Sequence, residues 1–190
     1  MPAFSFAIAT MNPIELGQGT FPLSEAATDR FAIMINIGYL PPPEEAKLVN
    51  FDFKRVRLRS LMSKERIIEL RARINEQVFL HERLGVYIQR LVAATRPYNP
   101  DTDWLVRSPS ELVERGVDLG ASPRAIICWG RLAKVWALLQ HHRAEVYPED
   151  IQSLAPYILG HRIWLGPHAA SHGLTTDAVI KDVVERVPIP

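Results

Sequence analysis

The sequence lacks the features that mark several common classes of protein. Cysteine occurs once, at Cys128, so the chain has no disulfide framework and no cysteine-based zinc site. No apolar run approaches the length of about 18 residues that suggests a membrane-spanning helix. The N-terminus has no basic segment followed by an apolar core, as a signal peptide would. With a formal net charge of +1, the composition gives no nucleic-acid signal. We therefore expect a cytoplasmic protein that neither enters a membrane nor binds nucleic acid.

The phosphate-binding loop of nucleotide hydrolases is also missing. The chain has ten glycines, and none of them falls in the pattern G-x-x-x-x-G-K-[ST], whose backbone N–H groups cradle phosphates. No apolar strand ends in a paired Asp-Glu that would hold Mg²⁺. We therefore expect the 190 residues alone to bind nucleotide weakly and to hydrolyse no ATP.

What is present is an ordinary globular composition, with 47% hydrophobic and 23% charged residues. The most informative stretch covers residues 6–39. Two apolar runs, 6–10 and 31–37, are typical of buried strands, and a short polar helix is expected before the second run. Asn12 and Arg30 stand at the exits of these elements.

Short motifs follow one another through this stretch. They are Ala9-Thr10, Asn12-Pro13, Glu15, Gly19-Thr20, Pro22-Leu23, Glu25-Ala26, Asp29-Arg30-Phe31 and Gly38-Tyr39. In this order they resemble the second half of the ATPase core in MoxR-type AAA+ ATPases. Met11 stands where that family often has Gln, and the loop at 16–18 is irregular.

The resemblance implies roles for two of these residues. Asn12 would be the sensor 1 residue, which orients the attacking water and contacts the γ-phosphate. Arg30 would be the arginine finger, offered to ATP bound by the next subunit. The alternatives are a turn asparagine before proline for Asn12, and for Arg30 a surface salt bridge with Asp29 or Glu25.

The remainder reads as helical. Pro41–Pro43 forms a boundary, and helices are predicted at about 44–50, 63–76 and 82–95. A capping box, Ser108-Pro109-Ser110-Glu111, predicts a short helix that reaches about Arg115. Further helices are predicted from Pro123, from Pro148, and after Thr175 or Thr176. The string Leu154 to Arg162 closely matches the closing lid helix of the same family. His168 and His172 are expected in a loop, and no metal site is expected.

Arg124 is the third candidate site residue. Ser122 and Pro123 have the residue types of an N-cap and a first helical position, so Arg124 would lie beside the positive end of the helix dipole. A cation is unfavourable there unless an anion fills the site, and an arginine with open backbone N–H groups makes a phosphate site. Gly120 to Arg124 also resembles the sensor 2 motif of the family. The alternative is a structural arginine.

Other positively charged residues allow weaker interpretations. Arg96 ends a predicted helix, where a cation is favourable in any case. Four cations between Lys54 and Arg59 alternate with apolar residues, which suggests either a solvated linker or a basic strip. Residues 98–119 form a longer insertion than we expect for the family.

Together these features predict a mainly α chain. Residues 1–42 would be the C-terminal part of an AAA+ core, an incomplete α/β segment of two strands and a short helix. This segment would be unstable alone unless it packs on the helical part or on another chain. Residues 43–190 would be an α-helical lid with sensor 2.

The resemblance implies an ATP-driven, chaperone-like machine that matures partner complexes. It implies ATP and Mg²⁺ as cofactors of the complete enzyme, a homo-oligomeric ring, usually a hexamer, and a von Willebrand factor A-domain partner. The alternatives are a magnesium-chelatase-type ATPase subunit, a non-catalytic helical interaction module, and a nucleic-acid-binding domain built on Lys54–Arg73. Gly120 to Arg124 and the His161-Arg162 ending favour the MoxR type over the chelatase.

Overall fold

The computed structural model describes residues 4–11, 23–99 and 108–190 of the chain. Its elements, in chain order, are α1 (Glu25–Thr28), α2 (Pro42–Glu45), η2 (Ala46–Asn50), η3 (Phe53–Arg55), α3 (Lys64–Gln77), α4 (Glu82–Ala94), α5 (Glu111–Gly116), β1 (Val117–Leu119), α6 (Pro123–His141), α7 (Pro148–Leu159), β2 (Trp164–Leu165), α8 (Pro167–Ser171) and α9 (Thr176–Arg186).

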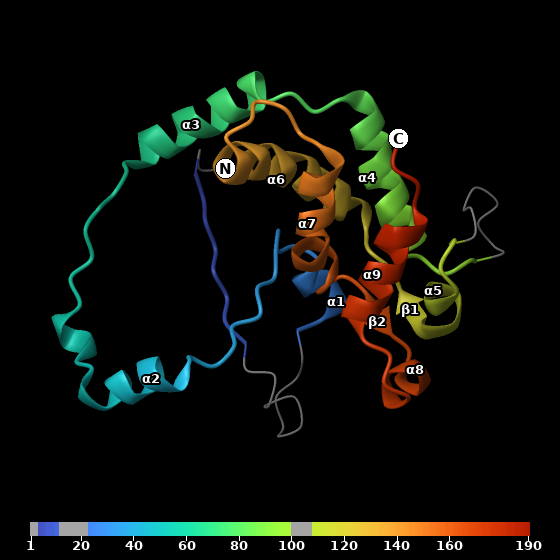
Figure 1. Cartoon of the computed structure of the whole chain (residues 1–190), viewed down its shortest axis with the longest axis horizontal. Coiled ribbons are helices and arrows are strands. Elements are labelled where there is room, and N and C mark those ends of the chain that lie inside the picture. Colours follow the sequence, from blue (N-terminus) through green and yellow to red (C-terminus); the bar gives the residue numbers. More distant parts are fainter. Residues whose placement is uncertain (1–3, 12–22, 100–107) are drawn as a thin grey trace.

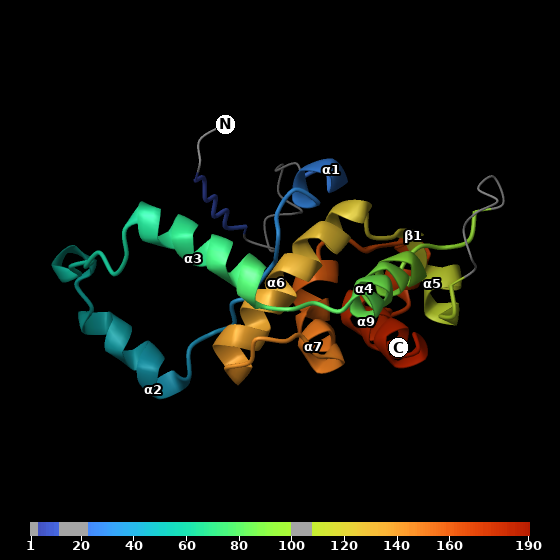
Figure 2. The ribbon, with the colours of Figure 1, turned by 90° about the horizontal axis from the view of Figure 1, so that it is seen from above.

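A helical body is built around the long helix α6 (Figures 1 and 2). Four fully buried residues recur every fourth position on one face of α6: Ala125, Trp129, Ala133 and Ala137. The three alanines let α4 and α7 pack closely against α6. The Trp129 indole donates a hydrogen bond to the Ile151 carbonyl of α7 at 3.0 Å. The buried hydrophobic side chains of the described residues all lie between 78 and 187, so this body holds the core.

The predicted caps at Ser63, Ser122 and Thr175 are confirmed, because capping depends on local sequence, whereas α5 begins two residues later than its predicted capping box and is capped by Ser110 in place of Ser108. The side chains of Ser63, Ser110, Ser122 and Thr175 each accept a backbone N–H of the first turn of their helix. At α7 the Asp150 carboxylate reaches back to the Tyr147 N–H at 2.8 Å.

The two strands predicted at 6–10 and 31–37 are not present as strands. The described residues there pair with no neighbouring strand, and Ile35 and Ile37 are 61% and 90% exposed instead of buried. An extended segment becomes a strand only when another strand completes its hydrogen bonds, and the described part of the chain supplies none to these segments. The sheet that does form was not predicted: β1 and β2 pair antiparallel, with Val117 opposite Leu165.

The chain from α2 to α3 runs outside the helical body (Figures 1 and 2). Helix α3 has no buried residue. The basic residues from Lys54 to Arg59 are exposed and lie in no strand, which fits a solvated linker and a basic strip equally well. The domain boundary expected after residue 42 falls at the first residue of α2 and stays a prediction.

The loop predicted for His168 and His172 is wrong in part. Pro167–Ser171 forms α8, and the two imidazole rings stack with centroids 4.2 Å apart at its C-terminal end. Proline at the first helical position favours this helix start, and the sequence analysis did not use it.

In the part of the chain that the structure describes, none of the helices combines the length and the apolar character needed to cross a membrane.

Candidate functional site

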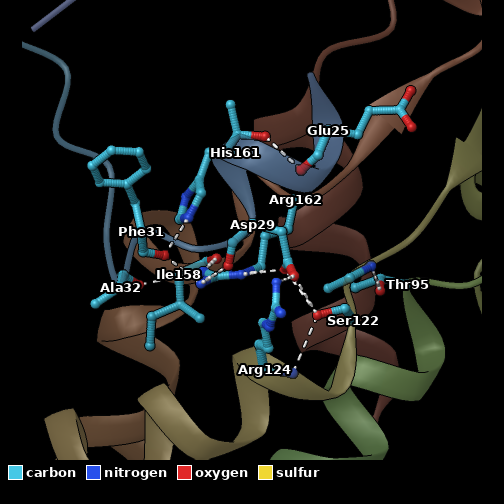
Figure 3. Close-up of polar contacts among 12 residues, drawn as sticks. Glu25, Asp29, Phe31, Ala32, Thr95, Ser122, Arg124, Ile158, His161 and Arg162 are labelled. Atoms are coloured by element: carbon cyan, nitrogen blue, oxygen red, sulfur yellow. Dashed lines mark hydrogen bonds and ion pairs between the residues drawn. The ribbon is translucent and has the colours of Figure 1, made fainter. Parts of the chain in front are cut away.

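The candidate site centres on Asp29, which directly follows α1 (Figure 3). Its carboxylate accepts a hydrogen bond from Arg162 Nε at 3.1 Å and from the Ser122 hydroxyl at 2.8 Å. Arg124 Nη1 lies 3.4 Å from the same carboxylate. One acidic residue thus joins the start of α6 to the end of α7, although Asp29 is separated from Arg162 by 133 positions in the chain.

Arg162 is the most deeply buried charge of this cluster. Its side chain is 1% exposed. Besides Asp29, its guanidinium donates to the backbone carbonyls of Asp29, Phe31, Ala32 and Ile158. A buried charge needs both a counter-ion and saturated hydrogen bonds, and Arg162 has both.

His161 contacts the same segment, at a carbonyl oxygen that Arg162 also binds. Its Nε2 lies 3.1 Å from the Phe31 carbonyl oxygen (Figure 3). Burial, reinforced by the Arg162 charge, lowers the pKa of His161 below its usual value. The neutral ring with a proton on Nε2 is therefore the favoured form, and it donates to Phe31.

Arg30 lies between Asp29 and Phe31 in the sequence, and its side chain is exposed. The alternative of a salt bridge to Asp29 or Glu25 is not realised, because Asp29 is used by Ser122, Arg124 and Arg162 and no pair with Glu25 forms. Among the described residues Arg30 forms only a backbone bond, from its N–H to the Ala27 carbonyl at 3.3 Å. Its guanidinium is thus presented to solvent from a fixed backbone.

Arg124 occupies the second position of α6, as predicted, but the anion there is part of the chain. The Arg124 backbone N–H donates to Ser122 Oγ at 3.2 Å, and Ser122 in turn donates to Asp29. The start of α6 therefore does not need a bound anion, contrary to the prediction, because the Asp29 carboxylate already complements the helix dipole. The Arg124 side chain is still 55% exposed, so most of its guanidinium surface is accessible to a ligand.

The loop before Ser122 is fixed by the C-terminal end of α4. Thr95 Oγ1 accepts the Ala121 N–H at 2.9 Å, and Arg96 Nε donates to the Ala121 carbonyl at 2.8 Å. A Cβ atom at Gly120 would overlap the Thr95 carbonyl and lie 2.8 Å from Arg96 Cα. This close approach explains the glycine and gives Arg96 a structural role.

Of the three predicted site residues, the structure brings the Arg30 segment and Arg124 together through Asp29. Asn12 lies outside the described residues. Asp29, His161 and Arg162 were not predicted as site residues, and Ser122 was predicted only as a helix cap. The signal was present in the D-R-F and H-R motifs, but no local rule pairs them.

The fold and this cluster define a class. The described core is a helical body around α6, and residues 110–183 match the family model described as the AAA lid domain, so this body is an AAA lid.

Known relatives narrow this class to one family. The chain is 32% identical over 195 residues to the chaperone MoxR1 of Mycobacterium tuberculosis (strain ATCC 25618 / H37Rv), covering 100% of this chain and 48% of MoxR1. It is 35% identical to the uncharacterised protein YeaC of Bacillus subtilis (strain 168), covering 97% and 53%. A crystal structure of a candidate ATPase from Cytophaga hutchinsonii ATCC 33406 superposes with a TM-score of 0.76 at 35% identity, covering 94% of this chain and 52% of that one.

The chain belongs to the MoxR-type AAA+ ATPases, where it corresponds to the C-terminal part. It spans about half the length of the relatives that it matches.

Proposed function

We propose that this chain is the lid and finger part of a chaperone-like ATPase, in which Arg30 acts on nucleotide held by a neighbouring subunit and Arg124 senses nucleotide from the lid. The observation that carries the proposal is the Asp29 cluster, which fixes the backbone at both positions and leaves both guanidinium groups exposed. A structural arginine would be expected to use its donors within the fold, as Arg162 does.

The exposed groups fit a phosphate. Guanidinium is planar and binds phosphate oxygens through paired N–H donors, which makes Arg30 and Arg124 suited to an anion with several oxygens. ATP, when bound with Mg²⁺, supplies the phosphoryl group that is transferred to water. Arg30 would stabilise the charge on that group. Arg124 would report its presence to α6, and Asn12 would orient the water.

Action of Arg30 on a neighbour requires an oligomer, and we propose a homo-oligomeric ring, with a hexamer as the expected size. We further propose that the ring remodels or matures partner complexes, with a von Willebrand factor A-domain protein as partner, in the cytoplasm. The name of the mycobacterial relative, a chaperone, supports the general activity. The partner rests on family resemblance.

The test is an Arg30→Ala substitution in the full-length ATPase. Loss of an arginine finger lowers the hydrolysis rate by roughly 10³- to 10⁵-fold, while nucleotide binding should stay within a few fold. Arg115→Ala is the matched control, because Arg115 is also exposed and, among the residues that the structure describes, pairs only with Glu111 on its own helix. That control should retain wild-type turnover.

A mixing experiment then separates action in trans from a structural effect. Arg30→Ala subunits should regain hydrolysis when mixed with subunits that are inactivated in their own nucleotide loop but still carry Arg30. Absence of rescue in mixed rings would contradict the finger role. Normal turnover by Arg30→Ala rings would favour the alternative of a helical interaction module for this part of the chain.

A further inference from the structure

We propose that Arg162 is a positioning residue for Arg30. Its hydrogen bonds hold residues 29–32, the segment that carries Arg30, against the lid of the same subunit, so that Arg30 moves with α7. This proposal rests on the proposed role of Arg30. It concerns a residue that itself touches neither nucleotide nor solvent, since its side chain is 1% exposed.

The contacts of Arg162 lie on both sides of Arg30 (Figure 3). Its Nη2 donates to the Asp29 carbonyl before Arg30 and to the Phe31 carbonyl after it. Its Nη1 donates to the Ala32 carbonyl at 3.3 Å, and its Nε to the Asp29 carboxylate at 3.1 Å. These bonds fix the backbone direction at Arg30 and leave the Arg30 side chain uninvolved.

The chemistry of arginine is needed for this arrangement. A guanidinium has five N–H donors in one plane, and at Arg162 all five are used, since Nη1 also donates to the Ile158 carbonyl. A lysine would keep the charge but offers only three donors around one atom, which cannot reach acceptors spread along three residues.

Most hydrogen bonds of the Arg162 guanidinium go to residues 29–32 and not to the lid. Of the five guanidinium bonds of Arg162, which lies just after the end of α7, one goes to Ile158 of that helix, and the other four acceptor atoms belong to residues 29–32. Burying a charge for such bonds is costly unless the geometry is well satisfied. The arrangement therefore orients residues 29–32 more than it stabilises the helical core.

The other anchors of the segment come from the same end of α7. The Met34 N–H donates to the Tyr157 carbonyl at 2.9 Å, and His161 Nε2 contacts the Phe31 carbonyl. The α6 start adds only the Ser122 and Arg124 contacts to Asp29. Beyond Met34 the described segment is exposed, as Ile37 and Tyr39 show at 90% and 93%. A rotation of the lid would accordingly carry Arg30 with it.

The first test measures amide hydrogen exchange in the 190-residue chain. Arg162→Lys should make the Phe31 and Met34 amides exchange roughly tenfold faster or more, because the segment opens locally, while amides of α6 keep their protection. Arg143→Lys is the matched control. Arg143 pairs with the fully buried Asp150 near the start of α7 and does not contact residues 29–32. It should leave the segment unchanged.

The second test measures turnover in the full-length ATPase. Arg162→Lys should lower kcat by at least tenfold with the KM for ATP within a few fold, and should add little to the loss caused by Arg30→Ala in the double variant. Arg162→Lys subunits should fail as finger donors in mixed rings while their own nucleotide sites remain usable. If Arg162→Lys does not fold, Asp29→Asn weakens the same link from the segment side, because it removes the counter-ion of Arg162 and leaves the backbone carbonyls of Asp29, Phe31 and Ala32 as acceptors.

The outcomes separate this proposal from the finger role. The positioning role would be overturned if Arg162→Lys left amide exchange at Phe31 and Met34 unchanged. It would also be overturned if Arg162→Lys made these amides exchange faster but kept kcat above half of the wild-type value, while Arg30→Ala was inactive. Full activity of Arg30→Ala would overturn the finger role itself, and the exchange data would still show whether the lid holds the segment.

Discussion

Asp29 meets two arginines in very different surroundings, and this difference predicts two different coupling energies. Arg162 is 1% exposed at its side chain and Arg124 is 55% exposed, while the Asp29 side chain is 17% exposed. We consider Asp29→Asn, which keeps the size of the side chain and removes its charge. In this variant Arg162 retains its four carbonyl acceptors and loses its counter-ion.

The magnitudes follow from burial. Removing one partner of a buried ion pair costs about 3 to 5 kcal/mol. Since the carbonyls still satisfy four donors of Arg162, we expect Asp29→Asn to lower the free energy of unfolding, or of detaching residues 25–34, by about 2 to 4 kcal/mol. The pair with Arg124 is largely exposed, so its coupling to Asp29 should be about 0 to 1 kcal/mol. The repulsion between Arg124 and the helix dipole lowers the net contribution of Arg124 to stability but cancels in the coupling energy.

Double-mutant cycles measure both couplings at the same carboxylate. One cycle combines Asp29→Asn with Arg162→Met, the other combines Asp29→Asn with Arg124→Ala, and both are measured by urea unfolding together with amide exchange at Met34. We expect the first coupling to exceed the second by at least about 1 kcal/mol. Equal couplings, or a larger one for Arg124, would refute the view that burial makes Arg162 the structural partner and leaves Arg124 available for ligand.

Two further predictions concern the neighbours of this cluster. The pKa of His161 is lowered in the fold by burial and by Arg162, with Asp29 opposing the shift, so the unfolded chain binds more protons than the folded chain as the pH falls below about 6.5, the usual pKa of histidine. The free energy of unfolding should therefore fall with decreasing pH, with a contribution from this group of at most about 1.4 kcal/mol per pH unit. His161→Gln should reduce that slope in thermal melts at pH 5.5–7.5, whereas an unchanged slope would mean that other groups cause it. Gly120→Ala should lower the free energy of unfolding by about 1 to 3 kcal/mol, because the added methyl group would overlap the backbone at Thr95 and Arg96. The control Gly85→Ala in α4, which has nothing within 4 Å of the added carbon, should be neutral or slightly stabilising. Equal effects of the two substitutions would contradict a close backbone approach at Gly120.

The sequence by itself determined the features that depend on neighbouring residues. Caps at Ser63, Ser122 and Thr175 determined where helices begin, because a side-chain oxygen and the N–H groups from which it accepts hydrogen bonds lie within a few residues of each other. The ordered motifs around Arg30 and Arg124 indicated the family, which the relatives confirm.

Only the tertiary structure decided which partners these residues have. The runs at 6–10 and 31–37 have the composition of strands, but a strand requires a neighbour, and none among the described residues pairs with them. The anion at the start of α6 was expected from a ligand and comes from Asp29, which lies 93 positions away from Ser122. The H-R motif marked Arg162 in the sequence but did not give its partners, because its burial and its bonds to residues 29–32 arise only when the end of α7 meets that segment. Contacts of this kind depend on the fold as a whole, and no local pattern encodes them.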